Sequence, residues 1–393
     1  MAYVASLDMG SETMVMALGE QDREEIHLIG VELAPSQGVV RGRMADKFQV
    51  KKVIQYLLET FRNNYGIQID TLQVALPGTW LKQVSDRENH TFSKPREVKV
   101  SHLEDLKDRC SNMSAKSALV AVLPVAYFLD GEEQAYPVGK TARHLEACFQ
   151  VYVAKESELA EFRALLKGVG VEEVSFFPAA EALSKALIPG RSKNTSFAIV
   201  DMGAESTKVV VVEKDRMVYD VELSLGGSSV DMDLNTAFSI RDMAKAQRLK
   251  HEFGMALRAE SKNQKVIIPD THSSIERKDL VLVEQSRLEE LLEGAIFQIQ
   301  QSGYYEELSS IFLTGGGSRT QGITTLMAKL SGCEVKGAVA AGVTAKTATD
   351  VQVPEFLTAL GLLHCGVKEK MRVERPIQRW FKGLFKEGEE NEK

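Results

Sequence analysis

A short segment that occurs twice constrains this chain more than any other feature. Residues 3–18 are YVASLDMGSETMVMAL and residues 197–212 are FAIVDMGAESTKVVVV. Each copy has an apolar run, then Asp-Met-Gly-x-Glu, then a Ser or Thr and a second apolar run, which predicts a strand, a tight turn and a strand. Asp-x-Gly is also common in ordinary turns. Two alike copies, however, favour a duplicated domain whose halves share one cleft.

The residues of these turns suggest what the cleft binds. Backbone amides of such turns can hold phosphate oxygens, and Asp8 and Asp201 can hold Mg²⁺ through its waters. A third segment, 310–332, predicts a buried strand, a glycine turn at Gly315, Gly316 and Gly317, and a helix. This turn has neither GxGxxG nor GK[ST] spacing, so it supports a nucleotide site only together with the two hairpins.

Composition excludes several classes of protein. A net charge of −7 disfavours nucleic acid as a partner. The four cysteines form no CxxC pair, so neither a zinc site nor a disulfide framework is expected. No apolar run reaches the ~18 residues of a membrane span, and the N-terminus does not resemble a signal peptide. We therefore expect a cytoplasmic chain.

The segment RPIQRWFKGLFKEG, residues 375–388, has a different character. On a helix, its apolar side chains fall within an arc of about 140° and its cations within about 60° on the opposite side. The residues concerned are Arg375, Ile377, Arg379, Trp380, Phe381, Lys382, Leu384, Phe385 and Lys386. This separation is typical of a helix in a membrane interface, although a helix docked on the protein body would have the same pattern.

Further segments extend the pattern along the chain. They are GVELAPSQGVVRGRMAD (30–46), KPREVKVSHLEDL (94–106), LSLGGSSVDMDL (223–234), KAQRLKHEFG (245–254) and TALGLLHCG (358–366). In order and spacing, they and the three loops resemble the FtsA family of bacterial cell-division proteins, within the actin-like ATPase superfamily. The resemblance implies an α/β, actin-like, duplicated two-lobed fold with an inserted α+β (SHS2-like) subdomain and a C-terminal amphipathic helix.

The resemblance also implies a division into subdomains. Subdomain 1A comprises residues 1–82 and 158–190, and the inserted subdomain 1C, expected as short strands around one helix, comprises 83–157. Subdomain 2A comprises 191–233 and 311–365, and subdomain 2B comprises 234–310. A linker, 366–374, leads to the membrane-targeting helix, 375–387. In subdomain 2B we expect helices at about 240–253 and 286–302, the second with its apolar residues in the core.

Site residues follow from the resemblance position by position. The implied contacts with phosphate and Mg²⁺ are Asp8, Gly10, Ser11, Thr13, Asp201, Gly203, Ser206 and Thr207, with Gly226 and Gly227 nearby. Lys245, Arg248, Gly315, Gly316 and Gly317 are implied around the adenosine.

Three positions depart from the family pattern. Thr13 replaces a basic residue, Glu205 a glycine, and Lys208 an aspartate. Lys208 either contacts phosphate or points to solvent, which is the commoner state of a lysine. These changes put fast hydrolysis in doubt more than binding, so at most a weak ATPase is expected, and no catalytic base is identified.

The implied function is a polymerising, ATP-binding tether that anchors FtsZ filaments. Its expected partners are the FtsZ C-terminal tail on subdomain 2B, other copies of itself, anionic lipids, and further division proteins on the inserted subdomain. Arg287 is a candidate FtsZ contact. The expected location is the cytoplasmic face of the inner membrane at the septum. A PilM-type pilus-assembly protein and a small-molecule kinase are alternatives; the terminal helix favours FtsA over the first, and the missing base disfavours the second.

Overall fold

The computed structural model describes residues 2–22, 25–110, 117–188, 195–268, 273–345 and 351–366. The predicted amphipathic helix and nearly all of the linker before it lie outside these residues. Among the described residues, no helix is long and apolar enough to cross a membrane.

The first half is built on a six-stranded mixed sheet with the order β11-β6-β1-β2-β3-β19. Its hairpin β1–β2 is antiparallel and its pair β1–β6 is parallel. The strands are β1 (Ala2–Met9), β2 (Thr13–Asp22), β3 (Glu25–Pro35), β6 (Thr71–Leu76), β11 (Glu173–Pro178) and β19 (Val343–Thr344). Helices α1 (Lys47–Tyr65) and α3 (Glu156–Lys167) bury apolar residues in this half.

The second half repeats the plan with a five-stranded sheet of order β14-β13-β12-β17-β18. It too opens with an antiparallel hairpin, β12–β13, and pairs its first strand in parallel with a later one. The strands are β12 (Ser196–Met202), β13 (Thr207–Glu213), β14 (Arg216–Leu223), β17 (Leu308–Thr314) and β18 (Val335–Gly337). The helices are α5 (Gly227–Ala237), α6 (Met243–Phe253), α7 (Arg277–Gln301) and α8 (Ile323–Ser331).

Two helices join the halves into one body. Helices α4 (Ala179–Leu187) and α9 (Leu357–Leu362) pack against each other and against strands of both sheets. Their apolar side chains share one core with Val15 of the first sheet and Val210 of the second. The halves therefore cannot separate without exposing this core.

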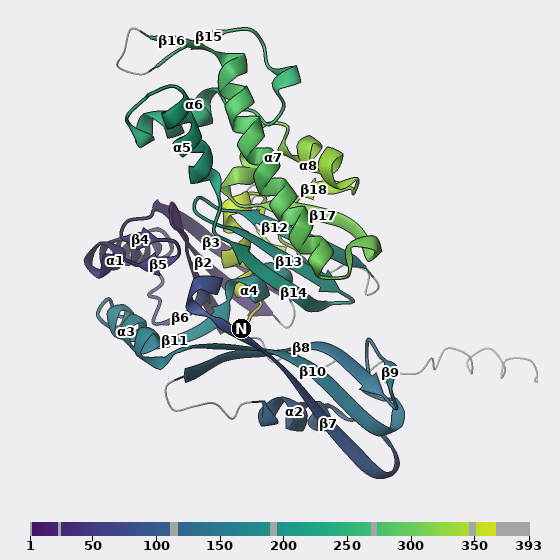
Figure 1. Cartoon of the computed structure of the whole chain (residues 1–393). Helices are drawn as coiled ribbons and strands as arrows, with labels where there is room; N and C mark the ends of the chain where they lie inside the picture. Colours follow the sequence, from purple (N-terminus) through teal and green to yellow (C-terminus); the bar gives the residue numbers. More distant parts are fainter. Residues whose placement is uncertain are drawn as a thin grey trace, which may run out of the picture.

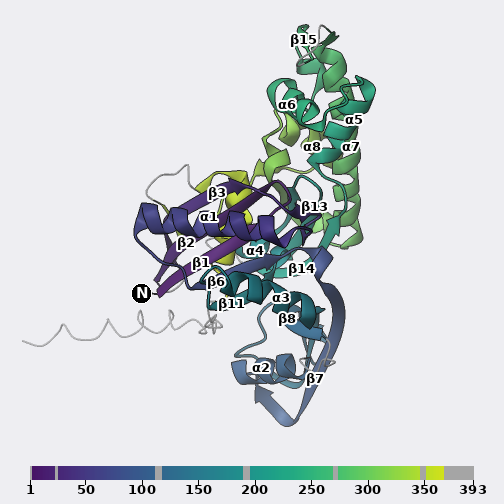
Figure 2. The ribbon, with the colours of Figure 1, turned by 90° about the vertical axis from the view of Figure 1, so that its left-hand side faces the viewer.

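A separate four-stranded sheet, order β7-β10-β8-β9, lies at the opposite end of the molecule from α5 and α6 (Figures 1 and 2). It contains β7 (Lys82–Glu97), β8 (Ser117–Leu129), β9 (Glu132–Glu133) and β10 (Thr141–Lys155), with α2 (Val100–Arg109) packed against it. Its range nearly coincides with that expected for the inserted subdomain, and its assignment as that subdomain stays a prediction.

The strands of this sheet differ from the expectation of short strands. Strands β7, β8 and β10 have 16, 13 and 15 residues. Pro95 lies in the edge strand β7, and Pro124 lies at a register shift between β8 and β10. Edge strands and bulges tolerate proline, so neither residue ends its strand.

Helix α7 is also longer than expected, since it starts at Arg277 rather than near residue 286. Leu280 and Val281 in its first turns are fully buried, and this packing outweighs the weaker helix propensity of the valines. The expected core face of α7 is confirmed, because each of its six apolar positions is buried: Leu288, Leu291, Leu292, Ala295, Ile296 and Ile299. The remaining strands form two short hairpins, β4 (Val39–Val40) with β5 (Arg43–Met44) and β15 (Lys265–Ile267) with β16 (Ser274–Glu276).

Candidate functional site

The two predicted hairpins have the same turn. The amide of Gly10 donates to the carbonyl of Thr13 at 3.0 Å, and the amide of Gly203 donates to that of Ser206 at 2.9 Å. A Cβ atom would come within 2.7 Å of the Thr13 oxygen at Gly10 and 2.9 Å of the Ser206 oxygen at Gly203. Both turns therefore need glycine. Asp8 and Asp201 lie at equivalent positions, just before the turns.

The two aspartates belong to a buried cluster of charges. The Nζ atom of Lys208 lies 3.1 Å from Oδ2 of Asp201, and these side chains are 19% and 10% exposed. Lys208 therefore does not point to solvent. Burial lowers the pKa of its ammonium, but the neighbouring carboxylates of Asp201, Glu222 and Asp8 outweigh this effect and raise the pKa overall.

Asp8 shares this cluster. Burial raises the pKa of its carboxyl group to about 6; the Lys208 ammonium opposes this rise, and the Asp201 and Glu222 carboxylates add to it. Electrostatics therefore couples the first hairpin to the second.

Glu222 on β14 is a member of the cluster that the sequence did not identify. Its Oε1 accepts a hydrogen bond from the Ser206 hydroxyl at 2.6 Å. Its Oε2 accepts one from the amide of Gly78, in the first half, also at 2.6 Å. An acidic residue in an ordinary strand sequence gives no signal of this role, because the role depends on a contact between the halves.

Other polar contacts also cross between the halves. The carboxylate of Glu205 accepts the amide hydrogen of Arg41 at 2.6 Å, and the Gln247 amide donates to Glu12 at 2.5 Å. Glu205, the residue that replaces a glycine of the family pattern, thus holds the loop around Arg41.

The hydroxyl of Thr207 donates to the carbonyl of Leu225 at 2.8 Å, so it is engaged within the protein.

The predicted glycine loops lie against the second hairpin. At Gly315, whose φ is +76°, a Cβ would come within 2.4 Å of the Asp201 carboxylate. At Gly226, one would come within 2.5 Å of the Ala204 carbonyl. Gly317 lies similarly close to Met202. The structure therefore brings these loops together with Asp201, as close backbone approach requires.

The two α6 residues that were predicted to lie around the adenosine, Lys245 and Arg248, differ in exposure. Arg248 is 71% exposed and pairs with Glu252 at 4.0 Å along its own helix. Lys250, which the sequence did not single out, is 13% exposed. Its ammonium donates to the carbonyl of Gly227 at 3.0 Å and pairs with Asp231 at 2.8 Å. Lys245 is 28% exposed, with its Nζ atom 4.0 Å from Asp242.

Coordination of Mg²⁺ through water by Asp8 and Asp201 stays a prediction. One carboxylate oxygen of Asp201 already receives the Lys208 ammonium, and both oxygens of Glu222 accept hydrogen bonds. A divalent ion at this place would lie beside the Lys208 ammonium and among the acidic groups of Asp8, Asp201 and Glu222. In the part of the chain that the structure describes, no three acidic, histidine or cysteine side chains are placed to hold a metal.

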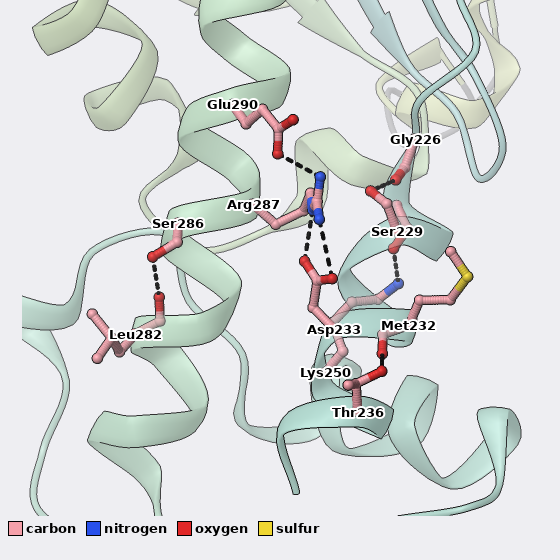
Figure 3. Close-up of polar contacts among 11 residues, drawn as sticks. Gly226, Ser229, Met232, Asp233, Thr236, Lys250, Leu282, Ser286, Arg287 and Glu290 are labelled. Atoms are coloured by element: carbon pink, nitrogen blue, oxygen red, sulfur yellow. Dashed lines mark hydrogen bonds and ion pairs between the residues drawn. The ribbon is translucent and has the colours of Figure 1, made fainter. Parts of the chain in front are cut away.

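Arg287, the candidate FtsZ contact on α7, is engaged with α5 (Figure 3). Its Nε and Nη2 atoms donate to the two oxygens of Asp233 at 2.6 and 3.1 Å, and a third nitrogen pairs with Glu290. The side chain is 24% exposed. Bidentate pairing of this kind fixes a guanidinium group, so Arg287 positions α7 on α5.

Comparison with solved structures identifies the class of protein. The structure resembles that of the PilM–PilN type IV pilus biogenesis complex, with a TM-score of 0.65 and 16% identity over 93% of this chain and 99% of the other. It also resembles MreB5 of Spiroplasma citri bound to ADP, with a TM-score of 0.54 and 11% identity over 91% and 94% of the two chains. The predicted actin-like ATPase fold is thereby confirmed. Proteins of this fold generally bind nucleotide.

Sequence comparison shows which family within this class the chain resembles. The family model "Cell division protein FtsA" matches residues 198–361. FtsA of Agrobacterium fabrum is 27% identical over 92% of this chain and 86% of its own length, and FtsA of Enterococcus faecalis is 25% identical over 84% and 77%. The predicted resemblance to the FtsA cell-division family is confirmed, and these names fit the chain better than that of PilM.

Proposed function

We propose that this chain is an ATP-binding, self-assembling division protein that anchors FtsZ filaments to the cytoplasmic membrane. One observation supports the proposal: the two alike hairpins and the Gly315 turn meet between the two lobes. The chain also resembles FtsA over most of its length. Its place would be the cytoplasmic face of the inner membrane at the septum, as a peripheral protein.

ATP is proposed to act as an assembly ligand. The Gly10 and Gly203 turns would face its phosphates, and the Gly315 turn its adenosine. The polar groups of the cluster are largely paired with one another, as in the contacts of Glu222 and Lys208. A general base needs a free acceptor within reach of the attacking water. We therefore expect a slow ATPase at most.

The FtsZ tail is proposed to bind the region 234–310, and other division proteins the sheet of residues 82–155. Because Arg287 is held by Asp233 and Glu290, we do not propose it as a contact for the tail. Exposed apolar side chains of the region, such as Phe297 at 54% and Leu282 at 46%, are better candidates for the contact. Apolar groups at the surface are typical of protein interfaces.

Membrane attachment is proposed for residues 375–387. Four cations near an anionic leaflet contribute about 1 kcal/mol each, and five apolar side chains add roughly 25 cal/mol for each Å² withdrawn from water. Ordering the segment opposes this by ~1–2 kcal/mol per residue of backbone. A single copy should therefore bind reversibly, whereas copies joined in a filament bind more tightly through effective concentration.

The test is deletion of residues 375–393, which all lie outside the described body. The shortened protein is expected to be diffuse in cells while it still binds ATP and FtsZ in solution, because the proposed membrane helix is a separate segment from the lobes that are proposed to bind ATP and FtsZ. Fluorescence localisation and co-sedimentation with anionic liposomes measure the first property. A control with Trp380→Glu and Phe385→Glu keeps the length but removes the apolar face. Septal membrane localisation that survives both changes would refute the tether.

A further inference from the structure

The two lobes are joined twice by the same kind of hydrogen bond. Glu205, in the turn after β12, accepts the amide hydrogen of Arg41, and Glu222 on β14 accepts that of Gly78, each at 2.6 Å. A hydrogen bond from an amide to a carboxylate is charge-assisted, so it is stronger than a bond between neutral groups. Arg41 and Gly78 are exposed residues of the first lobe. Water would therefore have to replace both carboxylates if the lobes moved apart.

The first-lobe side of this contact is one connected unit. Arg41 lies at the tip of the β4–β5 hairpin, and Gly78 begins a short 3₁₀ turn after β6. The Thr79 hydroxyl donates to the carbonyl of Arg41 at 3.2 Å, and the Trp80 indole donates to that of Gly42 at 2.7 Å. Trp80 is buried in the core of the first half. These bonds join the two loops to each other and to that core.

The second-lobe side is connected as well. The hydroxyl of Ser206, the residue after Glu205, donates to the Glu222 carboxylate at 2.6 Å. The amide of Gly203 closes the same turn by donating to the Ser206 carbonyl at 2.9 Å. Lys208 lies opposite Glu222 in the ladder of β13 and β14, and their charges attract. Both carboxylates are thus held on one hairpin and its neighbouring strand.

Two features of the Arg41–Glu205 bond set it apart from an ordinary surface contact. Arg41 has a φ of +49°, a left-handed conformation that is uncommon for a residue other than glycine. Such a conformation persists where surrounding contacts fix it, and the bond to Glu205 is one of these contacts. Glu205 also stands where the family pattern has glycine, which could not supply a carboxylate. This bond is therefore a property of this chain.

We propose that Glu205 and Glu222, with the amides of Arg41 and Gly78, form a carboxylate latch that keeps the two lobes closed whether or not a nucleotide is bound. The latch consists of protein groups alone. Because each side is a connected unit, loss of one bond weakens the other. The inference concerns the regulation of the proposed nucleotide site, but the latch itself does not rest on ATP binding.

The first test is hydrogen exchange of the full-length protein without nucleotide, followed by mass spectrometry. In Glu205→Ala, the peptide that contains Arg41 is expected to exchange about 10- to 100-fold faster than in wild type. The peptide that contains Gly78 should also exchange faster, although its own acceptor, Glu222, is intact. An unchanged rate at Gly78 would show two separate bonds and overturn the latch.

The second test compares wild type with and without ATP. The exchange rates at Arg41 and Gly78 are expected to change by less than about twofold on addition of ATP. Protection that appears only with ATP would overturn the latch and support the proposed ATP binding. Protection without ATP, combined with no heat of ATP binding in isothermal titration, would support the latch and overturn the ATP proposal. The two failures are thus distinguishable.

The matched control is Asp130→Gly. Asp130 is an exposed residue whose carboxylate accepts the amide hydrogens of Arg143 and His144 at 3.0 and 2.7 Å, within the four-stranded sheet. Glycine accepts its φ of +49°. The substitution removes a carboxylate from backbone amides away from the lobe contact, so exchange at Arg41 and Gly78 should match wild type.

A second variant covers the case in which Glu205→Ala does not fold, as judged by circular dichroism. Glu205→Gln keeps the shape and an acceptor oxygen but removes the charge, so it should accelerate exchange at both Arg41 and Gly78, by less than the alanine variant. Wild-type exchange rates at both positions in Glu205→Gln would overturn the role of the carboxylate. The comparison of wild type with and without ATP needs no variant.

Discussion

Glu284 on α7 shows what burial does to a single ionisable residue. The residue is 1% exposed, and its carboxylate accepts the amide hydrogen of Met255 at 2.8 Å. Burial raises the pKa of this carboxyl group from its ordinary value of 4.5 to about 7, and the opposing effects of the Met255 amide and the Lys250 ammonium are smaller. The folded protein therefore holds this proton more tightly than the unfolded chain does.

This difference predicts a pH dependence of stability. The free energy of unfolding includes a contribution from Glu284 that is fully present below about pH 4.5 and is lost as the pH rises to about 7. Glu284→Gln stays neutral, so its stability relative to wild type should rise between pH 5 and pH 8 by roughly 1–3 kcal/mol. Urea unfolding across this range measures the effect.

The control for this substitution is Glu293→Gln, an exposed position on the same helix. It should leave the pH dependence of wild type unchanged, because an exposed carboxylate is solvated alike in both states. If Glu284→Gln and wild type showed parallel stability curves, the buried carboxyl would not be the source of the slope.

At the scale of elements, α4 and α9 pack closely against each other in the shared core. A Cβ atom at Gly361 would lie 1.9 Å from the carbonyl oxygen of Ala182 and 3.0 Å from the Ala186 side chain. The residues of α9 are all buried, so the helix has no free space into which it could shift. Interiors packed this densely transmit such a displacement to their neighbours.

Gly361→Ala is therefore expected to destabilise the fold by roughly 1–3 kcal/mol, the cost of overpacking a core. Gly337→Ala, at the end of β18, is the matched control, because no atom lies within 4 Å of its added methyl group. Thermal unfolding followed by circular dichroism compares the two. Equal melting temperatures would mean that α4 and α9 separate more easily than their packing indicates.

At the scale of the whole molecule, the four-stranded sheet of β7 to β10 is fixed to the second half by polar contacts. Asp220 on β14 accepts hydrogen bonds from the Tyr152 hydroxyl and from Gln83 at 2.7 Å. The Tyr136 hydroxyl donates to Asp215, the residue just before β14, at 2.9 Å. Burial raises the pKa of Asp220, and the bonds from Tyr152 and Gln83 oppose that rise. The sheet lies within the first half of the sequence, and these bonds connect it to the second half.

Tyr152→Phe should weaken this junction by about 1–3 kcal/mol, because it leaves a buried carboxylate with one donor fewer. A double-mutant cycle with Asp220→Asn, measured by urea unfolding, isolates the coupling between the two side chains. Tyr56→Phe, at a position 59% exposed, controls for loss of a hydroxyl. Strict additivity of Tyr152→Phe and Asp220→Asn would contradict a direct role for this bond.

The sequence by itself determined the features that depend on neighbours along the chain. The Asp-x-Gly hairpins at Asp8 and Asp201, the glycine turn at Gly315 and the core face of α7 are local patterns, and each has the predicted form. Turn chemistry and helical periodicity act over a few residues, so they can be predicted from one segment of the sequence. The membrane helix is also a local pattern, and it stays a prediction outside the described residues.

The tertiary structure alone decided which charges meet. Nothing in the sequence placed Glu222 against Gly78, Lys250 against Asp231, or Glu205 against the Arg41 amide. Such contacts depend on strand register and on the packing of the two lobes against a shared core. Register and packing are both determined by the burial of many residues together. Of the two alternatives for Lys208, the solvent-facing one is wrong because strand register places Asp201 on one side of it and Glu222 on the other.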